Sequence, residues 1–203
     1  MAVVTERKHH ASLQKRIQQA AGEERAALSR EYYQSAANSN RIVSARALDA
    51  AFVIDNLNIV LQHIPGIDDC EPRAGVIGLI GLSLGGAVAT EFAKADGRGA
   101  FVVNIDGGIY GMRLDEPVSS PYLMMYSHAN DRCNASSLRS THPAGLLCKT
   151  VEHTKHLNFH EISMIYPALR WLRMIGTADP LQTIMLRNQY IIDFTKSITI
   201  KDT

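Results

Sequence analysis

The segment Gly81-Leu82-Ser83-Leu84-Gly85 has the G-x-S-x-G pattern that presents a nucleophilic serine on a sharp turn. An apolar run, Gly75 to Ile80, precedes it, and the helix-forming residues Gly86 to Ala95 follow it. In such a strand-turn-helix the serine backbone is strained, and we expect side chains at positions 81 and 85 to collide with the neighbouring strand or helix. The pattern predicts Ser83 as a nucleophile, with the amide of Leu84 at the helix N-terminus donating to an oxyanion.

Glycine-rich turns also bind phosphates and dinucleotides, so these two functions compete with the serine chemistry. A phosphate-binding P-loop has Lys after its last glycine, whereas Ala87 stands there. The glycines from 78 to 86 do not form G-x-G-x-x-G, although Asp106 lies twenty residues beyond Gly86, where a ribose-binding acid would sit. A purely structural alternative is that the glycines only allow a helix to pack closely on a strand.

A hydrolytic serine needs a histidine base and an orienting acid, and in this kind of fold the acid follows the serine along the chain. Asp106 lies 23 residues after Ser83, at the end of the next apolar run, and its spacing favours it. Asp131 follows the run after that and also qualifies. Asp106-Gly107 is also a common turn pair, so a structural role competes with the catalytic one.

Three histidines follow the last apolar run and could serve as the base: His153, His156 and His160. Their spacing alone does not choose between them. The same H-x-x-H-x-x-x-H run could suggest zinc, but no carboxylate stands at the usual offsets and no helix is indicated. We therefore predict no metal and no cofactor.

The elements that must position these residues alternate between strands and helices. Apolar runs at 75–80, 100–105, 122–126 and 146–151 indicate strands, and helical patterns cover 11–34, 42–64, 86–95, 162–175 and 181–198. Such alternation predicts an α/β fold of about four parallel strands with flanking helices. We divide the chain into an N-terminal helical extension, 1–40, and a domain over 41–203.

Composition excludes several other classes of protein. The 203 residues are 46% hydrophobic and 20% charged, which is typical of a folded domain, and the formal net charge of +1 argues against a nucleic acid partner. No apolar segment is long enough to be a transmembrane helix, and the N-terminal residues do not form a secretory signal, so we expect a cytoplasmic protein. The spacing of Cys70, Cys133 and Cys148 indicates neither a disulfide framework nor zinc.

From Arg41 onward the chain resembles the platelet-activating factor acetylhydrolase group of α/β-hydrolases, in its plasma and type II forms. Four segments carry the resemblance: Ala47–Leu57, Gly81–Thr90, Val103–Gly111 and His156–Phe159. The resemblance singles out His156 as the base and favours Asp106 over Asp131 as the acid. It implies a serine esterase that removes short acyl groups from phospholipids or similar esters.

The sequence departs from that family before Gly75. The family has a further half there, with the first strands of the sheet and a His-Gly loop that supplies a second oxyanion donor. Without those strands the strand before Ser83 becomes a sheet edge, which an N-terminal helix, a second copy of the chain or another polypeptide would have to cover. The alternative to an esterase is therefore a non-catalytic remnant or a partner-dependent interaction module.

Overall fold

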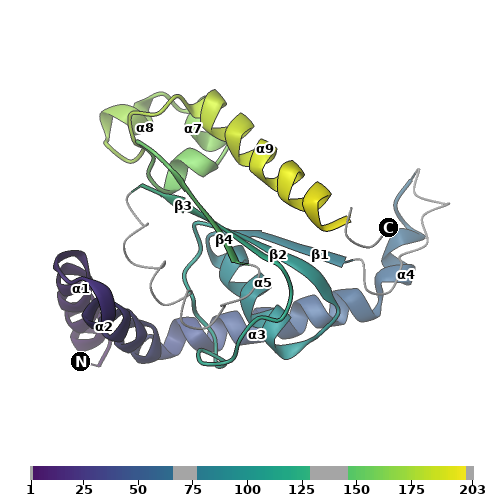
Figure 1. Cartoon of the computed structure of the whole chain (residues 1–203), viewed down its shortest axis with the longest axis horizontal. Coiled ribbons are helices and arrows are strands. Elements are labelled where there is room, and N and C mark those ends of the chain that lie inside the picture. The colour runs from purple at the N-terminus through teal and green to yellow at the C-terminus, as the bar shows by residue number, and fades with distance from the viewer. Residues whose placement is uncertain (1, 66–76, 129–145, 200–203) are drawn as a thin grey trace.

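A computed structural model describes residues 2–65, 77–128 and 146–199 (Figure 1). They contain one parallel sheet of four strands, in the order β1 (Ile77–Leu82), β2 (Gly99–Ile105), β3 (Tyr122–Ser127) and β4 (Leu146–Val151). The predicted α/β fold of four parallel strands with flanking helices is confirmed. The predicted start of the first strand, Gly75, lies outside the described residues, as do Cys70 and Cys133.

The two central strands are buried on both faces, which explains why they read as continuous apolar runs. Side chains on one face pack with α5 (Leu84–Ala95), namely Val102, Tyr122 and Met124 with Ala89. Side chains on the other face pack with α9 (Pro180–Thr199), namely Val103, Leu123 and Met125 with Phe194. Figure 1 shows α5 and α3 (Ala37–Asp55) on one side of the sheet and α9 on the other.

The N-terminal region is a helical hairpin, so the prediction of one helix over 11–34 is wrong. Helix α1 (Ala2–Gln19) ends before Ala20, and α2 (Gly22–Ser35) begins after an extended residue, Ala21. Gly22 has a φ of 53°, a conformation that costs glycine little. The guanidinium of Arg25 donates hydrogen bonds to the carbonyl of Ala20 and closes the turn. The reversal buries apolar side chains of both helices against each other: Leu13, Ile17, Ala20 and Leu28.

The predicted helical ranges place a break between residues 34 and 42, whereas the break lies at Ala36 and α3 runs through Asn38–Asn40. Asn40 is instead buried, where its side chain donates to the carbonyl of Tyr33 at 2.8 Å and accepts from the amide of Gly111 at 3.1 Å. Asn40 thus makes a buried contact between elements. After α3 the chain continues as α4 (Leu57–Leu61).

The C-terminal part also contains shorter helices than predicted. A 3-10 turn, η1 (His156–Phe159), is followed by α7 (Ile162–Ile165) and α8 (Ala168–Trp171) in place of one helix over 162–175. Pro167 stands between α7 and α8, and the residue before a proline is disfavoured in helical conformation. No helix in the described ranges is long and apolar enough to cross a bilayer.

Strand β1 lies at the edge of the sheet formed by the described residues, as predicted. It pairs with β2 through Ile77 to Leu82 and has no second strand neighbour among those residues. The side chain of Ile80 is half exposed on this strand. Coverage of this edge by an N-terminal helix, a second copy of the chain or another polypeptide stays a prediction.

Candidate active site

Ser83 occupies the single residue between β1 and α5. Its φ of 57° and ψ of −120° lie outside the regions that residues with a side chain favour, so its backbone is strained as predicted. The amide of Ser83 donates to the carbonyl of Ile105 at 2.8 Å, and its carbonyl accepts from the amide of Gly86 at 3.0 Å. These bonds fasten the strained turn at the carboxyl end of β1.

Only part of the predicted glycine crowding occurs around Ser83. A Cβ on Gly81 would lie 2.1 Å from the backbone of Gly85, so residue 81 must be glycine. The prediction for Gly85 is wrong, because a Cβ there would meet nothing within 4 Å on the exposed side of the helix. The second crowded position is Gly86, where a Cβ would lie 2.2 Å from Oδ1 of Asn104.

Asp106 follows β2 with a φ of 52°, and its carboxylate is fully buried. Its Oδ1 accepts a hydrogen bond from the amide of Ser127 at 2.7 Å, and its Oδ2 accepts one from Ser127 Oγ at 2.9 Å. Sequence reasoning missed the role of Ser127. The available signal was its place at the end of β3, the strand that pairs with β2.

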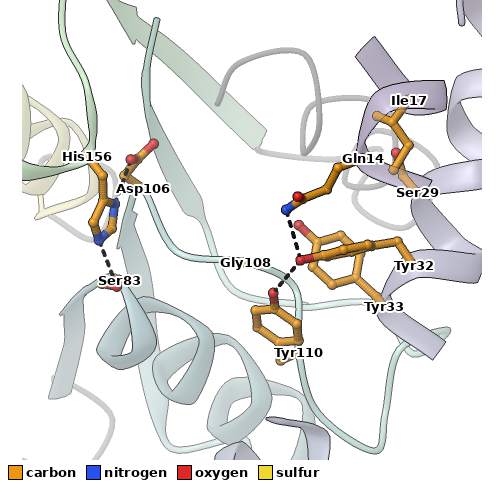
Figure 2. A pocket seen from close by; sticks show the side chains of 10 residues that line it. All are labelled: Gln14, Ile17, Ser29, Tyr32, Tyr33, Ser83, Asp106, Gly108, Tyr110 and His156. Carbon is orange, nitrogen blue, oxygen red and sulfur yellow. Dashed lines mark hydrogen bonds and ion pairs between the residues drawn. The ribbon is translucent and has the colours of Figure 1, made fainter. Parts of the chain in front are cut away.

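His156 begins η1, which follows β4 after residues 152–155, and connects the other two residues. Its Nδ1 lies 2.8 Å from Oδ2 of Asp106, and its Nε2 lies 2.9 Å from Oγ of Ser83. The structure therefore brings Ser83, Asp106 and His156 into one hydrogen-bonded chain (Figure 2).

The turn that carries His156 is fastened by polar contacts. Asn158 is fully buried, and its Oδ1 accepts hydrogen bonds from the amides of Lys155 at 2.8 Å and Gly176 at 2.7 Å. From α9, the guanidinium of Arg187 donates to the carbonyl of Phe159 at 2.5 Å. These contacts fix the ring of His156 relative to the sheet.

The hydrogen bond to Asp106 raises the pKa of His156 above its usual 6.5, and the negative charge of Asp106 adds to this effect. Partial burial of the ring opposes it by disfavouring the charged imidazolium. An imidazole that binds a proton more readily, and that also contacts a serine hydroxyl, can accept the proton of that hydroxyl.

The other candidates occupy different positions. The ring of His153 stacks on that of His128, with 6.3 Å between centroids, and the ring of His160 lies 6.0 Å from that of His156. Asp131 lies outside the described residues. Within the described parts of the chain, no three His, Cys, Asp or Glu side chains gather as metal ligands.

The loop after Asp106 is held by a buried polar network. The amide of Gly107 donates to Oδ1 of Asn104 at 2.8 Å, and Nδ2 of Asn104 donates to Thr90 and to the hydroxyl of Tyr122. Burial of Tyr122 raises its pKa to about 12, so its hydroxyl keeps its proton in this network. Further along the same loop, Glu91 accepts hydrogen bonds from the backbone at residues 112 and 113 and from Ser44.

A pocket of about 230 Å³ opens beside Ser83 and His156. Its far wall comes from the N-terminal hairpin, whose side chains Figure 2 shows facing Ser83 and His156 across Gly108. There the amide of Gln14 donates to the hydroxyl of Tyr32 at 3.3 Å, and that hydroxyl lies 3.4 Å from the hydroxyl of Tyr110. Sequence reasoning missed this wall, because helix periodicity does not show which distant site a helix faces.

Leu84 is the first residue of α5, so its amide has no partner inside the helix. The helix dipole makes this end attractive to negative charge. That Leu84 donates to an oxyanion stays a prediction.

No protein family model matches the chain, and no curated protein matches it. Among solved structures, a ferulic acid esterase from Streptomyces cinnamoneus is similar, with a TM-score of 0.58 and 22% sequence identity. The match covers 77% of this chain and 48% of that esterase, so the chain spans about half of its length. These findings leave the resemblance to the platelet-activating factor acetylhydrolase group a prediction. They establish that the chain shares its α/β fold with this esterase.

Proposed function

We propose that the chain is a serine carboxylic ester hydrolase with Ser83 as nucleophile. The observation that supports this most strongly is the hydrogen-bonded chain from Ser83 through His156 to Asp106, with distances of 2.9 and 2.8 Å. Three separate strand ends contribute these side chains, and the strained turn at Ser83 is typical of a nucleophile elbow.

In the proposed mechanism Ser83 Oγ attacks the ester carbonyl while Nε2 of His156 takes its proton. The imidazolium, stabilised by Asp106, then protonates the leaving alcohol as the carbonyl–oxygen bond breaks. Water then attacks the acyl carbonyl while His156 takes its proton. The bond to Ser83 Oγ breaks as His156 returns that proton to Oγ, and the carboxylic acid leaves. The amide of Leu84 would stabilise the oxyanion formed in both steps.

The proposed substrates are short-acyl esters, including phospholipid esters of the kind the family resemblance implies. A pocket of about 230 Å³ is smaller than most sites for drug-sized ligands, which supports a compact group beside the serine. The hydroxyls of Tyr32 and Tyr110 give its far wall hydrogen-bonding capacity.

The test is labelling with a fluorophosphonate probe together with hydrolysis of p-nitrophenyl acetate. We expect one labelled serine and loss of labelling in Ser83→Ala, with turnover lower by a factor on the order of 10⁶. Ser12→Ala, an exposed change on α1, is the matched control and retains both signals. A Ser83→Ala variant that keeps a tenth of the activity would refute the proposal.

A second candidate is a non-catalytic remnant or an interaction module that needs a partner. It is favoured by strand β1, which has no second strand neighbour among the described residues. Cooperative unfolding of the purified chain, together with no labelling and no ester hydrolysis, would support this candidate over the enzyme.

A further inference from the structure

Three linked polar side chains stand in the pocket wall opposite Ser83, and the proposed mechanism uses none of them. They are Gln14 on α1, Tyr32 on α2 and Tyr110 in the loop after Asp106, and we call them the polar wall. Figure 2 shows them joined by hydrogen bonds on the side of the pocket that faces Ser83. Two of the three belong to the N-terminal hairpin, which precedes the region of family resemblance.

The two tyrosine rings of the polar wall are held in place by aromatic packing. Tyr33, which is buried, packs edge-to-face on Tyr32, with 5.3 Å between ring centroids, and on Tyr110, with 5.0 Å. The ring of His10 lies 5.0 Å from that of Tyr32. A Cβ on Gly108 would lie 2.4 Å from the ring of Tyr110, so the missing side chain there leaves room for that ring. The hydroxyls are therefore positioned before a ligand binds, and binding need not order them.

The polar wall has hydrogen-bonding groups to offer a ligand. A glutamine amide carries two N–H donors and a carbonyl acceptor, and the bond from Gln14 to Tyr32 uses one donor. Within the described residues the side chain of Gln14 makes no other hydrogen bond, so its carbonyl oxygen can accept from a ligand. A hydroxyl both donates and accepts, so a ligand hydroxyl can bond to Gln14 and to the phenol of Tyr32 together.

The charges of the pocket disfavour an anionic ligand. Among the described residues that line it, none is Lys or Arg, and Asp106 contributes a negative charge. A phosphate or carboxylate that enters would lose its hydration without gaining a cationic partner beyond the imidazole of His156. The polar wall therefore complements an uncharged polar group.

We propose that the polar wall selects esters whose alcohol part carries a further, uncharged hydroxyl, such as monoesters of diols and other polyols. This inference rests on the proposed function, in which a short acyl group is attached to Ser83 and the alcohol part occupies the rest of the pocket. Gln14 and Tyr32 are then specificity-determining residues supplied by the hairpin. Among short-acyl esters, such a wall favours a neutral polyol ester over a phospholipid.

The first test measures kcat/KM, by titration of the released acetic acid, for acetates of straight-chain diols with two to six carbons. Each is compared with the alkyl acetate that has the same number of non-hydrogen atoms. We expect the hydroxyl ester to be favoured about tenfold or more at the chain length that reaches the polar wall. The acetate that carries a phosphate in place of that hydroxyl should be a poorer substrate than the alkyl acetate.

Tyr32→Phe and Gln14→Leu should each lower the ratio of the two kcat/KM values about fivefold, because each removes a hydrogen bond to the ligand hydroxyl. Tyr32→Phe keeps the ring and its packing, and a variant that is merely damaged lowers both values and leaves their ratio unchanged. Gln18→Leu, an exposed change one turn along α1, and Tyr166→Phe, an exposed change outside the pocket, are the matched controls and keep the wild-type ratio.

The second test measures binding, by NMR titration, of the acetamides that correspond to each pair of esters. Tighter binding of the hydroxyl-bearing amide, lost in Tyr32→Phe, would support the polar wall even if no ester were hydrolysed, which would overturn the proposed function alone. Equal kcat/KM values at every chain length, a wild-type ratio in both Tyr32→Phe and Gln14→Leu, or preference for the phosphate ester would overturn this inference while Ser83-dependent hydrolysis persists. Absence of hydrolysis together with equal binding of the paired amides would overturn both.

Discussion

Replacing Asp106 with Asn tests the proposed mechanism most sharply, because the structure determines how the new side chain must lie. The amide of Ser127 can only donate, and it faces Oδ1 of residue 106 at 2.7 Å. The carbonyl oxygen of the asparagine must therefore stay on that side. Its NH₂ group is then directed at Nδ1 of His156, at the position where Oδ2 of Asp106 lies 2.8 Å away.

An NH₂ group in that position donates to His156, so Nδ1 becomes an acceptor and the proton moves to Nε2. Nε2–H then faces Ser83 Oγ and can no longer take its proton. The variant also lacks the negative charge that stabilises the imidazolium. In a serine protease the corresponding change lowers turnover by about 10⁴, and we expect a loss of that order here.

The assay is steady-state hydrolysis of p-nitrophenyl acetate, with proton NMR of the imidazole Nδ1–H as a second measurement. The wild type should show that proton far downfield, and Asp106→Asn should not. Asp115→Asn is a control, since Asp115 is exposed and paired with Arg30 at the surface. Asp131→Asn should also be mild. Turnover within tenfold of wild type in Asp106→Asn, or a greater loss in Asp131→Asn, would refute the assignment of the acid.

Three further predictions concern pH, the serine turn and association. The pKa of His156 is raised, and only its neutral form accepts a proton, so kcat/KM should fall with decreasing pH at a midpoint above 6.5. Asp106→Asn should move that midpoint lower. A wild-type midpoint below 6.5 would contradict the proposed base. Gly81→Ala should lower the free energy of unfolding, measured in urea, by about 1–3 kcal/mol, because its Cβ would clash with the backbone. Gly85→Ala should not lower the free energy of unfolding, because the space around residue 85 is open. Equal losses in the two variants would disprove the crowding argument. Strand β1 has no second strand neighbour among the described residues, so the purified chain should associate as its concentration rises. Light scattering from a stable monomer of 22.4 kDa would show that the edge is protected.

The sequence predicted the sheet well because parallel strands buried on both faces read as apolar runs. Since the carboxyl ends of such strands meet at one edge, Ser83 and Asp106 could be expected to lie close together. Choosing His156 among three histidines required the family resemblance, because spacing alone leaves His153 and His160 equivalent. The contact with Ser83 depends on the 3-10 turn at residue 156, which has no strong sequence signature.

The helices were harder to predict because tertiary contacts decide where they break. The hairpin at Gly22 forms because Leu13 and Leu28 bury each other, a contact that local periodicity does not reveal. Asn40 lies inside α3, where its side chain bonds the carbonyl of Tyr33 on α2 and the amide of Gly111, and local sequence does not show these partners. The contribution of Gln14 and Tyr32 to the pocket wall could not be predicted for the same reason, because it depends on where the whole hairpin packs.

The sheet is wound so that each strand lies beside the one that precedes it in the chain. Ribosomal synthesis adds the groups of the site in the same order as the strands: the hydroxyl of Ser83, the carboxylate of Asp106, its support Ser127, and finally the imidazole of His156. Arg187, which fastens the histidine turn, is made later still. Under the proposed mechanism a nascent chain carries its nucleophile through the synthesis of residues 84–155 without a base to activate it. The hydrolytic activity would thus begin only after the histidine turn and α9 have been made.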